Sequence, residues 1–325
     1  MKQKQIAFLE MKIEKEYGNI AGIIVMKDDN AVYENYFNQC SESDPIHIFS
    51  VTKSIISMLF GIAIDKGCIK DLDEKVIDFF PNYQIQKREK TIQHITIRNL
   101  LTMTAPYKYK WNPYPKYFSS NDWVISSLDF LGGNGTIGKF KYAPIIGIDI
   151  LSGILINTTG KSVLEFAQDN LFSPLEISVD KNIYFQSKEE QLDFYKSKGA
   201  NGWVADPNGT NTAGWGLSLT TMDMAKLGQL YLNEGYWNGR QIISKKWIAE
   251  STQVQSVWKA RHLKYGYLWW IIDEAEHSYA ALGDGGNAIY VNPKDRMVVA
   301  VSSLFVPKVK DRIDFIKREI EPLFQ

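Results

Sequence analysis

A serine and a lysine stand three residues apart at Ser50 and Lys53, where a long apolar stretch begins. In a helix, residues i and i+3 share one face, so the lysine amine can reach the serine hydroxyl. A serine hydroxyl attacks a carbonyl carbon efficiently only when a base accepts its proton. Lysine can be that base where burial or nearby positive charge lowers its pKa. The pair therefore indicates a serine nucleophile with its general base, which is acyl-transfer chemistry.

The apolar stretch after Ser50 has the spacing of a helix, because its apolar residues recur every three or four positions up to residue 63. A Lys-Gly pair at 66–67 is typical of a helix end. We expect a mostly buried helix here. Such a helix would desolvate Lys53, and the positive end of its dipole would face the charge that develops during attack by Ser50.

The Ser-x-x-Lys spacing alone does not distinguish a catalytic pair from a structural one. Ser256 and Lys259 have the same spacing in a polar segment. Ser50 could equally cap the helix while Lys53 points into solvent. On spacing alone, both interpretations stay open.

Strand-like segments lie near both ends of the chain, and helical segments lie between them. This order favours one sheet built from both ends, with a mainly helical insertion. An active-site cleft is expected where the two parts meet. The expected helices are 6–16, 50–63, 97–103, 145–156, 163–171, 221–233 and 310–323, and the expected strands are 20–26, 31–37, 265–272, 278–282, 288–291 and 297–303.

The 325 residues (37.2 kDa) include 45% hydrophobic and 23% charged side chains, with 37 basic residues against 37 acidic ones. This composition is typical of a soluble globular protein, and zero net charge gives no field that attracts nucleic acid or an anionic membrane. The N-terminal segment lacks the apolar core of a signal peptide, and no run approaches the roughly 18 apolar residues of a membrane span. We therefore expect a cytoplasmic protein without nucleic-acid or membrane partners. The sequence leaves the oligomeric state open.

The cysteines and histidines show no metal-binding pattern. Cys40 and Cys68 lack a CxxC motif and are expected to be reduced thiols. The four histidines are scattered, and no Gly-x-Ser-x-Gly sequence is present, so neither a metal site nor a histidine-based triad is expected. Only His47 lies near Ser50 in the sequence. No cofactor is implied.

Four blocks of the sequence resemble the serine β-lactamase-related family, which includes class C β-lactamases, DD-peptidases, family VIII carboxylesterases and 6-aminohexanoate-dimer hydrolase. They follow one another in the family's order over roughly residues 46–304. The resemblance implies that Ser50 is the nucleophile and Lys53 the general base. The blocks are 49–67 (FSVTKSIISMLFGIAIDKG), 95–104 (ITIRNLLTMT), 214–228 (GWGLSLTTMDMAKLG) and 283–293 (GDGGNAIYVNP).

The resemblance also implies the fold. We expect an α+β, β-lactamase/penicillin-binding-protein-like fold, in which helices flank an antiparallel sheet and a mainly helical domain is inserted. The 325 residues would form one unit. Its α/β subdomain would comprise about 1–60 and 205–325, its helical subdomain about 61–204, and the cleft would lie between them.

In this family a tyrosine shares the proton with the lysine and passes it to the leaving group. The match in context is Tyr142, in the run Phe140-Lys-Tyr-Ala-Pro before an expected helix. Ala143 and Pro144 replace the usual asparagine and serine, so a polar side chain that normally contacts the substrate amide is missing. Packing as an ordinary aromatic residue is the alternative role of Tyr142.

The family's last active-site strand carries Lys-Thr-Gly or His-x-Gly, which aligns here with Gly283-Asp284-Gly285, followed by Gly286. The resemblance implies that the Gly286 N–H joins the Ser50 N–H as an oxyanion hole. Asp284 stands where β-lactam-binding relatives hold a substrate carboxylate, so its charge opposes anionic substrates. An ordinary hairpin turn is the alternative role of this segment.

Aromatic residues and two prolines fill the segment 107–123, and Trp111 is the candidate there for a substrate contact. Such a loop either roofs an apolar acyl pocket or packs on itself. Trp203 lies in a segment that resembles the 6-aminohexanoate-dimer hydrolase branch before the 214–228 block. This resemblance suggests that Trp203 lines the cleft.

We therefore expect a serine hydrolase that acts on a small ester or amide through an acyl-enzyme, without metal or cofactor. Efficient β-lactamase activity is less expected, because polar groups that bind such substrates are missing. The alternative class is a ligand-binding or sensing module on the same scaffold, which is acylated at most once and does not turn over.

Overall fold

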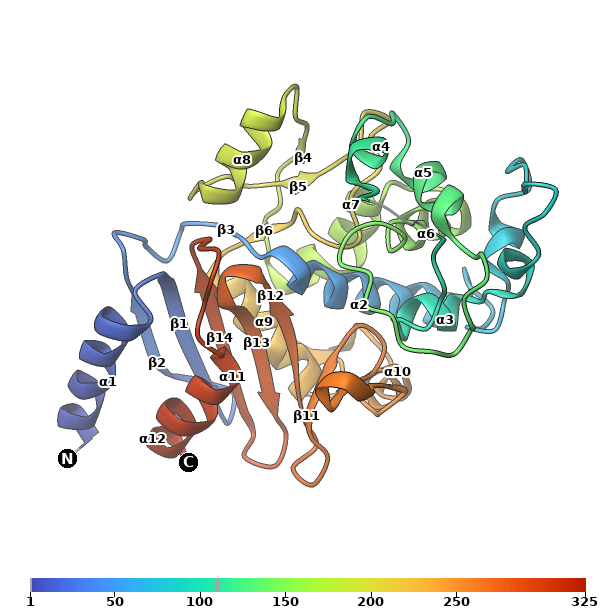
Figure 1. Ribbon diagram of the computed structural model, residues 1–325. Helices are drawn as coiled ribbons and strands as arrows, with labels where there is room; N and C mark the ends of the chain where they lie inside the picture. Colours follow the sequence, from blue (N-terminus) through green and yellow to red (C-terminus); the bar gives the residue numbers. More distant parts are fainter. Residues whose placement is uncertain (1, 109–111) are drawn as a thin grey trace.

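The computed structural model describes residues 2–108 and 112–325. One layer is an eight-stranded antiparallel sheet, whose strands are β1 (Ile20–Lys27), β2 (Asn30–Tyr36), β9 (Ser256–Trp258), β10 (Leu263–Tyr265), β11 (Trp270–Asp273), β12 (Ser278–Gly283), β13 (Asn287–Asn292) and β14 (Met297–Ser303). Their order is β2-β1-β14-β13-β12-β11-β10-β9, so segments from both ends of the chain lie side by side (Figure 1). Three two-stranded ribbons join β3 (Ile46–His47) to β6 (Ser218–Leu219), β4 (Asn182–Ile183) to β5 (Trp203–Val204), and β7 (Tyr236–Trp237) to β8 (Arg240–Gln241).

The α-helices are mostly short: α1 (Lys2–Glu16), α2 (Thr52–Asp65), α3 (Ile97–Leu101), α4 (Tyr114–Phe118), α5 (Trp123–Phe130), α6 (Ile150–Thr159), α7 (Val163–Ala167), α8 (Lys188–Lys196), α9 (Thr221–Leu232), α10 (Lys245–Ser251), α11 (Arg312–Phe315) and α12 (Glu321–Phe324). Tighter or wider helical turns are η1 (Phe49–Val51), η2 (Val76–Phe79), η3 (Thr91–His94), η4 (Gln168–Phe172), η5 (Ser173–Leu175), η6 (Lys259–Arg261), η7 (Asp284–Gly286) and η8 (Ile316–Ile320). Helices α3 to α7 lie in a second layer beside the sheet (Figure 1).

Helices cover both faces of the sheet, which explains why β1 and β14 are almost wholly apolar and buried. On one face, α1 and the C-terminal helices pack with Ile23 and Val25 of β1. On the other face lies α9, where a β-carbon at Gly228 would fall 2.5 Å from Val298. The absence of a side chain at Gly228 thus lets α9 approach the sheet closely.

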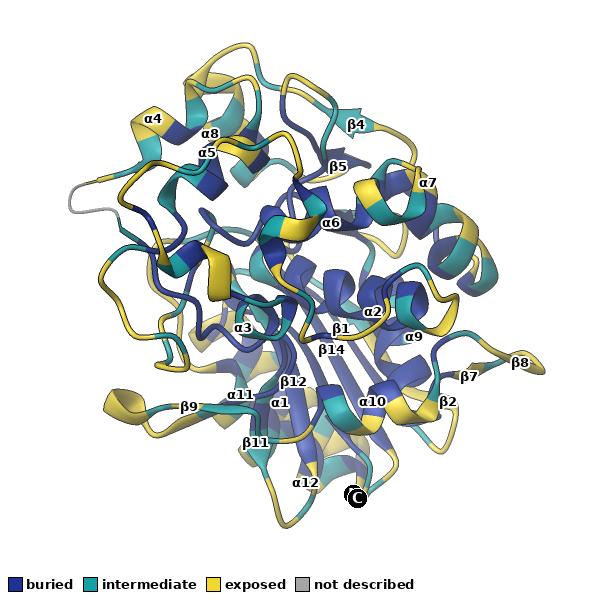
Figure 2. Ribbon diagram, turned by 90° about the vertical axis from the view of Figure 1, so that its right-hand side faces the viewer, coloured by how far each residue is buried: buried dark blue, intermediate teal, exposed yellow. Residues whose placement is uncertain are grey.

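Helix α2 lies in the interior, between the two layers. Every residue from Thr52 to Ala63 is buried, and Figure 2 shows the helix in the middle of the molecule. It contacts β12 at the sheet and α6 in the helical layer. The first turn of α2 is therefore placed at the junction of the layers.

The segment 265–272, expected as one strand, is two strands in the structure. The chain turns between β10 and β11, where Leu268 has a φ of +62°. Gly266 approaches the Ser251 carbonyl so closely that a β-carbon would lie 2.1 Å from that oxygen. A contact with a distant segment thus sets this turn.

Two helical expectations also differ from the structure. The helix expected over 145–156 begins only at Ile150, after Gly147 has adopted a φ of +97°. Within 107–123, where no helix was expected, α4 forms with a proline in its first turn. In the described part of the chain, none of the helices is both long and apolar enough to cross a membrane.

The sheet built from both ends and the mainly helical middle, which the order of the elements favoured, are confirmed. The helix expected over 310–323 forms through α11, η8 and α12 in succession. The numerical boundaries between the two subdomains stay a prediction.

Candidate active site

Ser50 lies in the turn η1, directly before α2. The preceding residue, Phe49, has a φ of +48°, a left-handed conformation that costs a non-glycine residue roughly 1–3 kcal/mol. The Phe49 ring packs on His47 and Phe305, with ring centroids 3.9 and 5.2 Å away. This packing holds the strained turn and leaves Ser50 partly exposed on the wall of a cleft.

The amine of Lys53 is held by three oxygen atoms in the interior. Its Nζ lies 2.9 Å from Ser50 Oγ and 2.7 Å from each of the carbonyl oxygens of Pro144 and Gly214. The residue is 1% exposed. Burial lowers the pKa of Lys53 to about 7, although two nearby carboxylates oppose this effect. A substantial fraction of the amine is therefore neutral near pH 7.

The two carbonyl groups determine how a neutral amine is oriented. An ammonium group has three N–H donors and no lone pair, whereas a neutral amine has two donors and one lone pair. When both hydrogens are donated to Pro144 and Gly214, the lone pair is left for the Ser50 hydroxyl. This arrangement can orient Lys53 as the proton acceptor of Ser50.

Tyr142 reaches the same place from the loop before α6. Its ring centroid lies 5.4 Å from Lys53 Nζ, and its hydroxyl is close enough to the Ser50 side chain for Ser50 to lower the pKa of the phenol. Burial raises the pKa of Tyr142 to about 12, and the interaction with Ser50 lowers it only in part. The phenol is therefore protonated at neutral pH and can donate a proton.

The loop that carries Tyr142 is held by Met103, at the end of the 95–104 block. The Met103 carbonyl accepts a hydrogen bond from the Lys141 N–H at 2.7 Å, and its Sδ accepts one from the Ala143 N–H at 3.4 Å. Met103 itself has a φ of +56°. Bonds on both sides of Tyr142 thus fix the backbone there, which gives this block a physical role although it lines no part of the cleft.

Ser50 and Tyr142 line a cleft of about 600 Å³. Trp258 and Trp270 form an aromatic wall, with ring centroids 6.2 and 5.7 Å from that of Tyr142. A cleft of this volume can enclose a small molecule. Its charged lining residues are Arg261, Lys264, Asp284 and Asp311.

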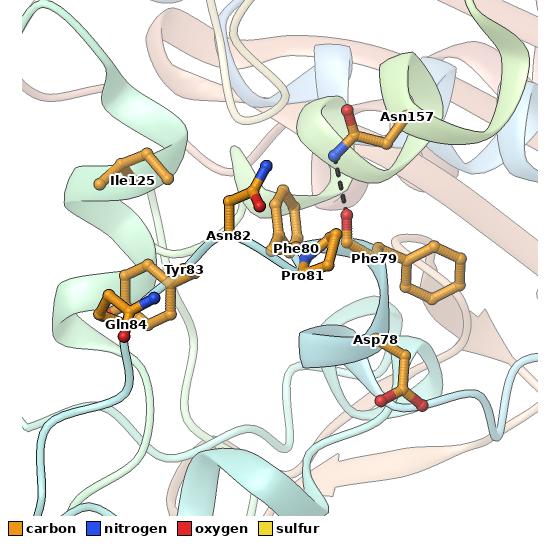
Figure 3. Close-up of a pocket in the computed structure, with 9 residues that line it drawn as sticks. All are labelled: Asp78, Phe79, Phe80, Pro81, Asn82, Tyr83, Gln84, Ile125 and Asn157. Carbon is orange, nitrogen blue, oxygen red and sulfur yellow. Dashed lines mark hydrogen bonds between the residues drawn. The ribbon is translucent and has the colours of Figure 1, made fainter.

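A second cavity, of about 790 Å³, lies beside η2 and α5 (Figure 3). It is lined by residues 78–84 together with Ile125 and Asn157. The Asn157 amide donates a hydrogen bond to the Phe79 carbonyl at 2.9 Å, and the Asp78 carboxylate points away from the other labelled residues (Figure 3). Its lining holds no nucleophile with an adjacent base. We therefore place the candidate active site at Ser50.

The end of β12 lies against the nucleophile. A β-carbon on Gly283 would fall 2.2 Å from the Ile48 carbonyl oxygen and 3.2 Å from the Ser50 nitrogen, so a larger residue would displace the backbone. Gly283 and Asp284 both line the cleft. The peptide group that joins them is therefore close to the Ser50 N–H.

Gly285 and Gly286 are buried behind the cleft and do not line it. Gly285 has a φ of +76°, and this turn directs Gly286 toward Arg312, whose Nε donates a hydrogen bond to the Gly286 carbonyl at 3.3 Å. The expectation that the Gly286 N–H completes the oxyanion hole stays a prediction, because these contacts involve the carbonyl of Gly286 and not its N–H.

Side chains from both ends of the chain hold the turn after Asp284. Asn19 donates through Nδ2 to the Gly285 carbonyl at 2.7 Å and accepts from Arg312 Nη2 at 2.7 Å. Arg312 in turn donates to the Gly286 carbonyl. This pair, Asn19 and Arg312, fixes the loop from behind, on the side away from the reacting groups.

Trp203, which was expected to line the cleft, is not among its lining residues. Trp203 is fully buried, donates its indole N–H to the Thr212 carbonyl at 2.8 Å and packs near Phe172, so it belongs to the core. Trp111 lies outside the described residues. Trp258 and Trp270 line the cleft instead, and the aromatic-rich run from 265 to 270 was a signal for Trp270.

Asp149 is a buried carboxylate near Lys53 that the sequence did not single out. It is 1% exposed, and it accepts hydrogen bonds from the Ala213 N–H at 2.7 Å and from the Tyr117 hydroxyl. Burial raises the pKa of Asp149 to about 6, while these two hydrogen bonds lower it. Because Gly214 follows Ala213, Asp149 fixes the segment whose carbonyl holds Lys53.

His47 supports the turn and is not placed as a base. Its Nε2 accepts a hydrogen bond from the Gly216 N–H at 3.0 Å, and the residue is 2% exposed. Burial lowers the pKa of His47 to about 3, so the ring is neutral. Among the described residues, no three His, Cys, Asp or Glu side chains are grouped so that they could hold a metal ion, and Cys40 and Cys68 are free thiols.

Three features define the β-lactamase and penicillin-binding-protein fold class: an antiparallel sheet from both chain ends, a helical layer, and a serine and a lysine at the start of the helix between them. The chain belongs to the Beta-lactamase family, whose model matches residues 12–318. The expected α+β fold and the family resemblance are thereby confirmed.

The chain is 26% identical over 264 residues to an uncharacterized protein from Alkalihalophilus pseudofirmus. The matched region covers 78% of this chain and 71% of that protein. It is 21% identical over 318 residues to the 6-aminohexanoate-dimer hydrolase of Paenarthrobacter ureafaciens, covering 91% and 75%. A solved family VIII carboxylesterase matches with a TM-score of 0.75 at 14% identity, covering 99% of this chain and 97% of that one. The structural likeness shows the fold, so activity has to be argued from the site.

Proposed function

We propose that the protein is a serine hydrolase that cleaves a small ester or amide through an acyl-enzyme at Ser50. The observation that carries this proposal is the buried Lys53 amine, with two carbonyl oxygens and Ser50 Oγ around it. A pKa near 7 lets this amine accept a proton at neutral pH. The names of two relatives, a dimer hydrolase and a carboxylesterase, agree with this class.

In the acylation step, Ser50 Oγ bonds to the substrate carbonyl carbon while its proton passes to Lys53. The carbonyl π electrons move to the oxygen, which becomes an oxyanion. As the tetrahedral intermediate collapses, Tyr142 gives its proton to the leaving oxygen or nitrogen, and the Lys53 ammonium returns a proton to Tyr142. The alcohol or amine departs, and the acyl group stays on Ser50.

Hydrolysis of the acyl-enzyme uses the same groups. A water molecule gives a proton to the neutral Lys53 amine as its oxygen bonds to the ester carbon. When the acid leaves, Lys53 returns this proton to Ser50 Oγ, directly or through Tyr142. Water enters from the open side of the cleft, because Ser50 is partly exposed.

The oxyanion would be bound by the N–H groups of Ser50 and Asp284. The Ser50 N–H lies at the start of a helix, where backbone donors have no partner within the helix. The Asp284 N–H is the donor next to Gly283, whose backbone packs against Ser50. Two such donors stabilise the charge that forms during attack. We infer Asp284 N–H as the second donor in place of Gly286.

Esters and small amides fit this cleft better than β-lactams. The loop 283–286 carries no cation that could hold a β-lactam carboxylate, and Asp284 adds a negative charge there. The negative charge of Asp284, in the same cleft as Ser50, would repel an anionic substrate.

The test combines a fluorophosphonate active-site probe with turnover of p-nitrophenyl acetate and of a chromogenic cephalosporin. We expect labelling and many turnovers of the acetate, both lost in Ser50→Ala. Ser256→Ala is the matched control, since Ser256 has the same Ser-x-x-Lys spacing but donates its hydroxyl to the Thr102 carbonyl at 2.7 Å. A single stoichiometric burst, or no labelling, would instead favour the ligand-binding module and contradict the proposal.

A further inference from the structure

Asp284 places a carboxylate beside the nucleophile that acyl transfer does not require. It lines the same cleft as Ser50 and Tyr142. Its charge attracts the Lys53 ammonium and thereby raises the pKa of Lys53. This effect opposes the general base, because it favours the protonated amine. The carboxylate therefore calls for an explanation other than catalysis by Lys53.

The two cationic side chains that line the cleft together with Asp284 have other partners. Lys264 forms an ion pair with Glu274. The Arg261 guanidinium lies 4.5 Å above the Trp258 ring. Within the described residues, no side chain forms a salt bridge with Asp284, and the three oxygen neighbours of the Lys53 amine leave it without a free position. The cleft thus holds an unpaired carboxylate.

One wall of the cleft that Asp284 lines is aromatic. Tyr142, Trp258 and Trp270 lie together there. Aromatic faces attract organic cations, and the Arg261 guanidinium over Trp258 shows that a cation already lies on one of these rings. A carboxylate together with aromatic faces is the chemistry that recognises an amine or a quaternary ammonium group.

We propose that the substrate carries a positively charged amine or quaternary ammonium group a few bonds from the scissile carbonyl, and that Asp284 binds this group. The inference rests on the proposed hydrolase function and names the substrate class of that site. A bound cation would offset the charge of Asp284 and thereby favour the neutral form of Lys53. The matching substrate would thus activate the base that acts on it.

The test uses isosteric esters that differ only in charge. On the acyl side these are p-nitrophenyl 4-(trimethylammonio)butanoate and p-nitrophenyl 5,5-dimethylhexanoate, and on the leaving-group side acetylthiocholine and 3,3-dimethylbutyl thioacetate. In the wild-type protein, we expect kcat/KM to favour the cationic member of at least one pair by roughly five- to tenfold. This preference should fall as salt is raised, because the carboxylate is exposed.

Three variants locate the preference. Asp284→Asn should reduce the cationic-to-neutral ratio to about one, and Asp284→Lys should invert it. Asp311→Asn is the matched control: Asp311 lines the same cleft, but its carboxylate caps α11 by accepting from the N–H groups of Ile313 and Asp314. This control should keep the wild-type ratio, since asparagine also caps helices.

The wild-type measurement alone can overturn the inference. Equal kcat/KM within both isosteric pairs would refute the cation preference while leaving the hydrolase function intact. A preference that persists in Asp284→Asn would refute the role of Asp284. Failure to hydrolyse even the neutral esters would instead refute the proposed function itself.

Discussion

The two walls of the cleft are held in different ways. On the helical side, Lys53 is buried and surrounded by three oxygen atoms, two of them from the loops at Pro144 and Gly214. On the side of β9 to β11, Trp258 is half-buried and Arg261 is exposed. A base needs a fixed surrounding to keep a shifted pKa, whereas an exposed wall can change without disturbing it. The fixed wall thus carries the proposed general base, whereas the exposed wall can vary without changing the surroundings of that base.

The largest effect is expected at the buried wall. Ser50→Ala and Lys53→Met should each lower kcat for p-nitrophenyl acetate by at least about a thousandfold, because nucleophile and base act as one unit. The double variant should lose little more than either single one. Circular dichroism spectra should stay unchanged. If the losses of the two single variants multiplied in the double variant, Ser50 and Lys53 would act independently, and the prediction that they act as one unit would be wrong.

Tyr142→Phe should lower kcat by about a hundredfold for an alkyl ester, because the ring remains while the proton donor is lost. The loss should be smaller for p-nitrophenyl acetate, since p-nitrophenolate leaves without a proton. Comparing kcat for ethyl and p-nitrophenyl esters of one acid measures this difference. An equal loss for both esters would indicate that Tyr142 positions Ser50 and does not protonate the leaving group.

Activity should rise with pH through about 7, because Lys53 must lose its proton to act as the base and its pKa is lowered to about 7. Asp149→Asn removes a carboxylate that raises the pKa of Lys53, so the acidic limb of the kcat/KM profile should move to lower pH. The asparagine oxygen can still accept from Ala213. Asp78→Asn, in the cavity of Figure 3, is the control and should not move the limb. A shift to higher pH in Asp149→Asn would contradict this assignment.

The smallest effect is expected at the exposed wall. Arg261→Ala removes an exposed charge that stacks on Trp258, and kcat/KM for a neutral ester should change by no more than about twofold. Steady-state kinetics with p-nitrophenyl acetate measures this change. A loss comparable to that of Lys53→Met would show that the two walls are not separate in function.

Local patterns sufficed for the elements that carry the reacting groups. Apolar spacing predicted the helix after Ser50, and the order of strands and helices predicted the sheet from both ends. The depressed pKa of Lys53 was stated only as a condition, since the carbonyls that hold its amine lie 91 and 161 residues away in the chain. Such distant contacts leave no periodic signal near Lys53.

The errors share a physical cause as well. Trp203 was placed by its resemblance to relatives, but the direction of a side chain depends on one or two backbone angles. Trp203 turns its indole to the core. The turn between β10 and β11 depends on the Ser251 carbonyl from another segment. In each case the deciding contact is tertiary.

The hydrogen bonds of Asn19 and Arg312 to the turn at Gly285 and Gly286 have a consequence for the order in which the chain folds. During synthesis, Ser50 and its helix leave the ribosome long before Arg312 is made. Domains tend to fold from the N-terminal side as the chain emerges. Until residue 312 is in place, the glycine turn lacks the support that Arg312 gives to Gly286 and Asn19, and the proposed second oxyanion donor would be held less firmly. The proposed acylation of Ser50 would thus depend on a residue that is translated long after Ser50.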